Sequence, residues 1–182
     1  MFTKPRIRKR QAPSLREMSN PLIPPACRKP SLINSKTFFF LNKSGSLSSL
    51  GWDDDNEIKE QEKNVSKLWR YNQHYFDDLN AIDSIDRITW HQSLLIDWVT
   101  VNIPGNGVGW DPYPTSLRIV NWIKWQCKGG NLPHICLKSL AIQTRWLAKR
   151  IEWHILGNHL FANAKSLVYA VLFFDGKEAD TW

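Results

Sequence analysis

Cysteine and long apolar runs are both scarce in this sequence. Cys27, Cys127 and Cys136 are the three cysteines among 182 residues. Their number is odd and their spacing is not that of a metal site, so we interpret them as small core residues or free thiols, with a disulfide left open. The longest apolar run, residues 167–174, is too short to cross a bilayer. We predict no membrane span and no cofactor.

Export and nucleotide-binding signals are also missing. The N-terminus is basic, but residues 11–17 stand where a signal peptide needs an apolar core, so no export signal is visible. The glycine-rich stretch 105–109 lacks the preceding strand and the lysine of a phosphate-binding loop. Strand-like alternation of apolar and polar residues is absent, and we therefore predict an all-α fold.

The positive charge is confined to one end of the chain. The sequence carries a net charge of +7, but residues 1–50 hold ten basic residues against one acidic residue, and the remainder holds 14 against 16. The body is therefore nearly neutral, which argues against a nucleic-acid-binding surface on the fold itself. The basic arm could still contact phosphate or an acidic glycan.

The same N-terminal stretch has its own composition. Residues 1–51 contain six of the ten prolines and a single apolar cluster, Phe38 to Leu41. Proline at this density blocks regular helix. We predict a loosely ordered arm over 1–51 whose aromatic cluster docks onto a helical body over 52–182, with the acidic segment 53–57 at the boundary.

From Val65 onward the apolar residues recur at helical spacing. Short connections between the helical segments predict antiparallel helix hairpins. Asp111 is placed to cap the helix that opens with Pro112 and Pro114. The pattern predicts helices over about residues 65–79, 88–98, 112–126, 133–155 and 160–175.

Asn158 and His159 form a polar pair directly after Gly157, between two helical patterns. Asn158 can be a helix-capping residue, and His159 can be a structural histidine whose ring nitrogens have hydrogen-bond partners within the protein. Spacing alone favours this interpretation. The alternative is a site, because an amide donor and an imidazole at a helix N-terminus can bind a carboxylate and move a proton. We interpret nearby Glu152 as a surface partner of Lys149 or Arg150.

A second group of residues suits a sugar ligand. Aromatic faces beside a guanidinium and an amide match a ring that has both apolar C–H faces and polar substituents. Burial in a helix core is an equally good explanation for Trp122. The candidate substrate-binding residues are Trp110, Tyr113, Arg118, Asn121, Trp122 and, from an earlier helix, His74.

Three ordered motifs carry a family resemblance. Residues 68–76 (LWRYNQHYF), 104–122 (PGNGVGWDPYPTSLRIVNW) and 155–163 (ILGNHLFAN) resemble the N-terminal helical domain of heparinase II/III-like polysaccharide lyases, over roughly residues 30–182. The resemblance implies an incomplete α/α toroid, truncated at its C-terminal side, that a β-sandwich follows in full-length members. It also implies β-elimination on uronic-acid glycans such as heparan sulfate or alginate, in the periplasm or cell envelope, although a cytoplasmic location stays open because no signal is visible.

The resemblance assigns roles to two residues. Asn158 matches the amide that neutralises the substrate carboxylate, and His159 matches an adjacent histidine that takes part in proton transfer in some members. The family's catalytic tyrosine and a further histidine lie beyond the matched region, and Tyr169 is not at the matching position. We therefore expect half a site with little or no lyase activity alone. An opened toroid would also expose core surface, and we expect it to aggregate or to stay partly unfolded.

The implied partners are an acidic polysaccharide and the remaining C-terminal portion of the same protein. The alternative function is a non-catalytic glycan-binding or assembly protein in bacterial surface-polysaccharide biosynthesis. A nucleic-acid-binding module is the weakest of the three hypotheses, because the body is nearly neutral.

Overall fold

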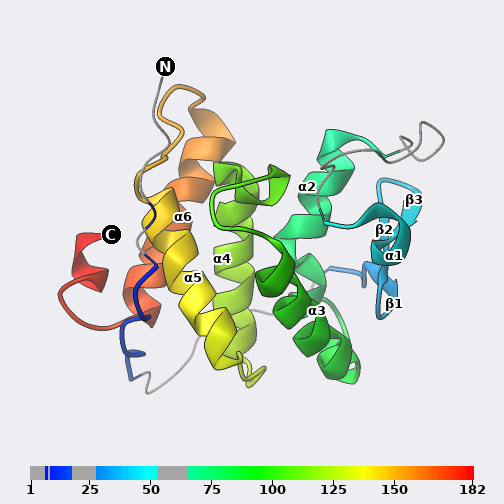
Figure 1. Ribbon diagram of the computed structural model, residues 1–182, viewed down its shortest axis with the longest axis horizontal. Coiled ribbons are helices and arrows are strands. Elements are labelled where there is room, and N and C mark those ends of the chain that lie inside the picture. The colour runs from blue at the N-terminus through cyan, green and yellow to red at the C-terminus, as the bar shows by residue number, and fades with distance from the viewer. Residues whose placement is uncertain (1–6, 8, 18–27, 53–64) are drawn as a thin grey trace.

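The computed structural model describes residue 7 and residues 9–17, 28–52 and 65–182 (Figure 1). The chain is mostly helical, as predicted, with one small sheet. Cys27 and the acidic segment 53–57 lie outside the described residues. The strands are β1 (Leu32–Asn34), β2 (Thr37–Phe40) and β3 (Lys43–Ser46), and the α-helices are α1 (Leu47–Leu50), α2 (Lys67–Tyr75), α3 (Ile88–Val101), α4 (Pro112–Cys127), α5 (His134–Leu147) and α6 (Gly157–Phe173).

The longer helices form two layers. Helices α2, α4 and α6 all begin at the same end of the molecule, the upper end in Figure 1, and α4 packs against both of the others. Helices α3 and α5 run the opposite way, contact each other, and α5 covers α4 and α6. Short 3₁₀ turns at Asp77–Asn80, Ser84–Arg87, Val108–Trp110 and Ala179–Thr181 complete the described elements.

The three-stranded antiparallel sheet overturns the prediction that strands are absent. Its strands are three or four residues long, too short for a periodic signal, but Thr37 to Phe40 are residues with high strand propensity. Leu41 and Asn42 join β2 to β3 and both have positive φ, 52° and 60°, as a two-residue type I′ hairpin turn requires. Part of the predicted arm is therefore regular structure.

The sheet packs beside α2 through aromatic contacts. Phe38 is 5% exposed and Phe39 48%, so neighbouring residues of β2 face opposite ways. The rings of Phe38 and Phe40 meet Trp69 of α2 edge-on, at centroid distances of 6.5 and 5.3 Å. The aromatic cluster of the arm thus docks onto the first helix of the body, and the sheet covers that side of the helical array.

Residues 9–17 also lie against the body. Arg16 N donates to Phe173 O at 2.9 Å, beside an isolated bridge between Leu15 and Phe174. The buried Arg145 of α5 bonds both oxygens of Glu178, at 3.0 and 2.9 Å, and the carbonyl oxygens of residues 10 and 11. These contacts tie the two ends of the chain to α5 and α6.

Helix α5 ends at Leu147, so the helix predicted to reach residue 155 is too long. Residues 148–156 form the connection between α5 and α6, and the side chain of Asn163, on α6, binds its backbone. Asn163 is fully buried, and its Oδ1 accepts from Glu152 N at 2.8 Å. A continuous apolar stripe predicted one helix because sequence periodicity cannot register a side-chain bond from the next helix.

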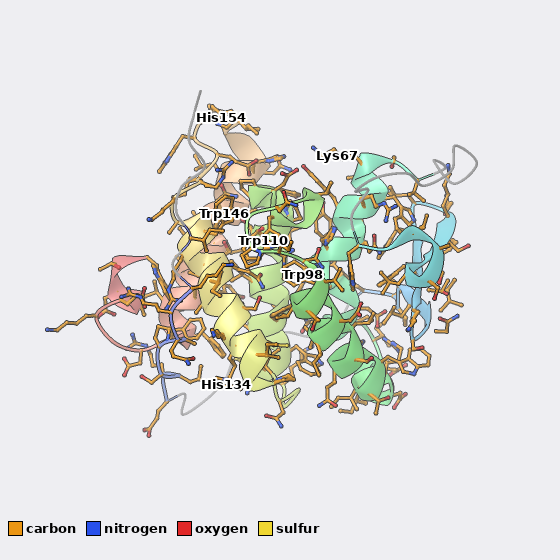
Figure 2. The ribbon with its side chains drawn as sticks, viewed as in Figure 1. Lys67, Trp98, Trp110, His134, Trp146 and His154 are labelled. Atoms are coloured by element: carbon orange, nitrogen blue, oxygen red, sulfur yellow. The ribbon has the colours of Figure 1, made fainter. Side chains whose placement is uncertain are left out.

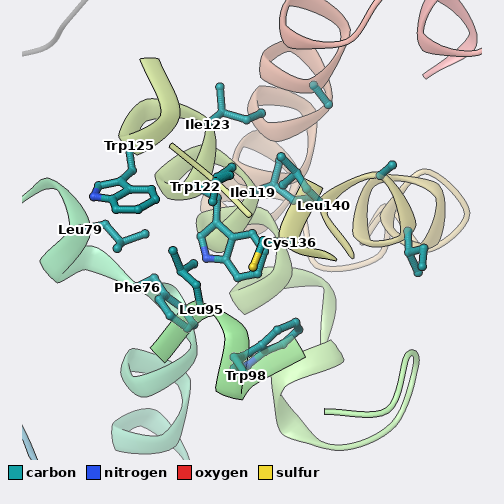
Figure 3. Close-up of a cluster of buried hydrophobic side chains, with 14 of the residues drawn as sticks. Phe76, Leu79, Leu95, Trp98, Ile119, Trp122, Ile123, Trp125, Cys136 and Leu140 are labelled. Carbon is teal, nitrogen blue, oxygen red and sulfur yellow. The ribbon is translucent and has the colours of Figure 1, made fainter. Parts of the chain in front are cut away.

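The core is rich in aromatic rings. Figure 3 shows Phe76, Leu95, Trp98, Trp122 and Cys136 gathered between the helices. Trp98 and Trp122 are fully buried, with ring centroids 5.8 Å apart. Cys136 is buried and Cys127 half-buried, and both are free thiols, as predicted. Within the described residues no helix has both the length and the apolar character that a transmembrane segment requires.

Candidate functional site

Four of the six residues predicted to bind substrate lie in the core. His74, Arg118 and Trp122 are fully buried, and Trp110 is 2% exposed. Their positions follow from α4, which packs against α2, α5 and α6 and has little free surface. The structure therefore gives these four side chains interior partners, in place of the surface contacts to a sugar that their residue types predicted.

His74 bridges two parts of the interior. Its Nδ1 accepts a hydrogen bond from Trp98 Nε1 at 3.0 Å, so its Nε2 carries the proton and donates to Trp52 O at 2.9 Å. Burial, and then the charge of Arg118, lowers the pKa of His74 to about 3. The imidazole is neutral at physiological pH and serves as a fixed donor and acceptor.

Asn121 is half-buried and also has internal partners. Its Nδ2 donates to Tyr75 O at 2.8 Å and to Asp77 Oδ1 at 2.7 Å, which joins α4 to the end of α2. Tyr113 is different, because its ring is partly exposed and stacks on the imidazole of His159, with centroids 4.3 Å apart and planes 28° apart. The fold therefore brings Tyr113, a predicted substrate-binding residue, into contact with His159, a predicted catalytic residue, at the surface.

A buried carboxylate lies behind this pair. Glu152 Oε2 is 3.2 Å from His159 Nδ1, close enough for an ion pair. The angle between the two groups does not suit a hydrogen bond. The same oxygen accepts from Asn163 Nδ2 at 3.2 Å, and Glu152 is 8% exposed. Glu152 is thus not the surface partner of Lys149 or Arg150 that the sequence predicted. Tyr113, Glu152 and His159, with the adjacent exposed Asn158, are called the Tyr113–His159 cluster below.

Asp111 provides a second polar feature at the same end. Tyr71 Oη donates to Asp111 Oδ2 at 2.6 Å, and Lys67 Nζ lies 3.3 Å from that oxygen. Burial, and then the hydrogen bond to Asp111, raises the pKa of Tyr71, so the phenol stays protonated. Asp111 is the N-cap residue of α4, as predicted, and its C=O accepts the first bond of the helix, from Thr115 N at 3.1 Å. Its carboxylate makes no capping hydrogen bond and is directed to Tyr71 and Lys67 instead.

These features share the end of the molecule where α2, α4 and α6 begin. Lys67 and His154, both labelled in Figure 2, lie at that end. Helix N-termini carry partial positive charge and free N–H groups, which favour an anionic ligand. Tyr71 and Glu152 were not predicted as site residues. Their partners lie on other segments of the chain, and contacts of this kind leave no local pattern in the sequence.

A metal-based site finds no support in the part of the chain that the structure describes, since no group of three or more His, Cys, Asp or Glu side chains there is placed to hold an ion. Comparison of the chain with protein-family models, curated proteins and solved structures gives no match. The functional assignment therefore rests on the motifs in the sequence and on the geometry of the Tyr113–His159 cluster.

Proposed function

We propose that this chain binds an acidic glycan and forms the N-terminal part of a polysaccharide lyase that acts by β-elimination on uronic-acid glycans such as heparan sulfate or alginate. The observation that carries the proposal is the stacked Tyr113–His159 pair next to Asn158, where three helices begin. All three residues belong to the motifs that resemble the lyase family. On this proposal the protein acts in the periplasm or cell envelope.

The chemistry needs two groups that this cluster offers. In β-elimination the C5–H bond of the uronate breaks, a C4=C5 double bond forms, and the C4–O bond breaks to release the neighbouring sugar as an alcohol. Negative charge builds on the C5 carboxylate in the transition state, so an amide donor such as Asn158 binds it most strongly at that moment. An imidazole at His159 can transfer a proton, and the Tyr113 ring limits how that imidazole turns.

No tyrosine of this sequence matches the family's catalytic residue. Tyr169 is half-buried on α6 with the Lys165 ammonium 5.9 Å from its ring centroid. A proton-transfer residue contributes on the order of two to four powers of ten in rate. We therefore expect this chain to form little unsaturated product from heparan sulfate or alginate, as followed by ultraviolet absorbance. Robust product formation would contradict the half-site assignment.

Binding tests the proposal directly. We expect isothermal titration calorimetry to detect binding of alginate or heparan sulfate oligosaccharides but not of a neutral glucan. Asn158→Ala should weaken that binding about tenfold, because it removes a hydrogen bond to a charged group. The matched control is Asn34→Ala, which changes an exposed amide on β1 and should leave affinity unchanged.

Three outcomes are informative. A folded chain that binds no acidic glycan would overturn the proposal. Equal binding of acidic and neutral glycans would exclude the carboxylate as the recognised group. Acidic-glycan binding that is insensitive to Asn158→Ala would favour the non-catalytic glycan-binding alternative.

The proposed toroid also needs a neighbour for α6. Phe161, Val168 and Leu172 lie on one face of this helix and are 70%, 56% and 60% exposed. Apolar faces of this kind are rarely left bare in stable monomers. On this proposal the further helices of the toroid, the implied remaining portion of the protein, cover the face.

This face yields a second prediction. The chain should self-associate, and the double substitution Val168→Glu and Leu172→Glu should shift it toward monomer in sedimentation velocity, because charged side chains oppose burial of the face. The thermal midpoint should change little, since both side chains are exposed. A Val101→Glu control adds charge at an equally exposed valine of α3, away from this face of α6, and should have a weaker effect. A monomeric wild-type chain would remove the support for a missing neighbour.

A further inference from the structure

A groove of about 340 Å³ lies beside the Tyr113–His159 cluster. Lys67 of α2 lines one side, and Trp146 of α5 and Arg150, three residues after that helix ends, line another. The glycine-rich loop before α4 and Trp110 complete the groove. Figure 2 shows Trp110 and Trp146 close together, with Lys67 across from them on α2. The volume falls at the lower end of the range of small-ligand sites.

The groove contains a guanidinium for which the described part of the chain supplies no acidic partner. Arg150 lies over the indole of Trp146, with its Cζ 4.4 Å from the ring centroid. Among the described residues, no carboxylate pairs with it, and its side chain makes no hydrogen bond. A guanidinium stacked on an aromatic face keeps its N–H edge free, and that edge matches the geometry of a carboxylate or sulfate.

The walls of the groove are fixed before a ligand arrives. Trp146 Nε1 donates to Trp110 O at 3.0 Å, which sets the orientation of the indole on which Arg150 rests. Gly105 has φ of 79°, and a Cβ there would lie 2.6 Å from Ile7 Cδ1 and 3.2 Å from the Trp146 ring. Glycine at this position lets the loop backbone lie directly on the indole.

Charge favours an anion in the groove. Two cationic side chains, Lys67 and Arg150, line it against one carboxylate, Asp111, and Asp111 already pairs with Lys67 and Tyr71. Asp111 and Pro112 line the groove and lead directly to Tyr113, so the groove and the cluster are neighbours along the chain. One glycan could therefore reach both.

We propose that this groove is a second subsite, which binds the carboxylate or sulfate group of an acidic sugar next to the one held at the Tyr113–His159 cluster. Arg150 is the main contact and Lys67 the second. This inference rests on the proposed function, because it takes the ligand to be an acidic glycan chain. It adds that binding depends on glycan length, since a single sugar cannot occupy both places.

The test compares charge-removing variants on glycans of two lengths. Arg150→Gln should weaken binding of an alginate tetrasaccharide about tenfold, and Lys67→Gln severalfold, whereas binding of glucuronate alone should change little. The control is Lys149→Gln, which removes the same charge from an exposed residue outside the groove. Circular dichroism and thermal midpoints equal to wild type would show that each variant folds.

The outcomes separate this inference from the proposed function. Absence of acidic-glycan binding by the wild-type chain would overturn both. Binding that falls with Asn158→Ala but not with Arg150→Gln or Lys67→Gln would overturn the second subsite alone. An equal loss with Lys149→Gln would attribute the effect to general charge and would also overturn it.

Discussion

Replacing Arg118 by methionine is expected to lower the free energy of unfolding by about 3–5 kcal/mol, which would place this substitution among the most damaging in the chain. The guanidinium is fully buried, and its Nη1 donates to Gly109 O at 2.8 Å and to His74 O at 3.3 Å. Methionine keeps an unbranched apolar stem but leaves these buried carbonyl groups without that donor. Urea unfolding followed by tryptophan fluorescence measures the loss.

The size of the effect follows from how many elements Arg118 joins. Its Nε donates to Gln143 Oε1 of α5 at 2.9 Å, and its Cζ lies 3.9 Å from the centroid of the Trp98 ring of α3. One side chain therefore links α3, α4 and α5 with the end of α2 and the loop before α4. Lys149→Met, an exposed control, should cost under about 0.5 kcal/mol. A loss of similar size in both variants would contradict the structural role of Arg118.

The helices were predictable because their apolar periodicity is strong. In α3, the buried residues His91, Leu94, Leu95 and Trp98 recur at three-to-four spacing within the helix predicted over residues 88–98. Helix α4 begins at Pro112, as predicted, since proline suits a first turn whose amides need no intrahelical partner. The local pattern of apolar residues is sufficient to predict a helix where one face of that helix meets the core.

The interior polar residues were not predictable in the same way. A guanidinium that binds backbone carbonyls inside a protein needs the same donors as one that binds a sugar, so the sequence could not separate these roles for Arg118. Periodicity also identifies one buried face, whereas α4 packs against three helices and buries Trp122 as well. These residues were assigned to a ligand because their tertiary partners, such as Gln143 and Trp52, are distant in sequence.

The sequence predicted two residues of the candidate site, Asn158 and His159, but not the carboxylate of Glu152. Asn158 and His159 stand out because a glycine interrupts two helical patterns beside them. Glu152 was hidden, since the predicted helix ran through it and gave it a surface position. The end of α5 at Leu147 and the bond from Glu152 N to Asn163 turn this carboxylate toward His159, and neither feature has a local signature.

Asp78→Asn is the other substitution with a large expected effect, a loss of about 3–5 kcal/mol in unfolding free energy. The carboxylate is buried and accepts from Arg87 Nε and His91 Nε2, both at 2.8 Å. It also accepts from the backbone amides of Ser31 and Leu32, at 2.6 and 3.0 Å, which fixes β1 to the body. An amide in its place offers one acceptor oxygen and leaves a nearly buried cation without its counter-charge.

The effect of Asp78 should depend on pH in a direction set by its environment. Burial by itself favours the neutral acid, but the hydrogen bonds from His91, Arg87 and the two amides outweigh burial and lower the pKa of Asp78. A carboxyl whose folded pKa is depressed contributes stability that is complete above its ordinary pKa of 3.8 and is lost as pH falls toward the folded value.

The difference in unfolding free energy between wild type and Asp78→Asn should therefore stay nearly constant from about pH 7 to pH 5 and shrink below about pH 4. Urea unfolding at each pH measures it. Asp86→Asn, which changes an exposed acid of the nearby 3₁₀ turn, should differ little from wild type throughout. A difference that is small at neutral pH, or that grows as the pH falls, would show that the Asp78 carboxylate does not hold β1 to the helices through its charge.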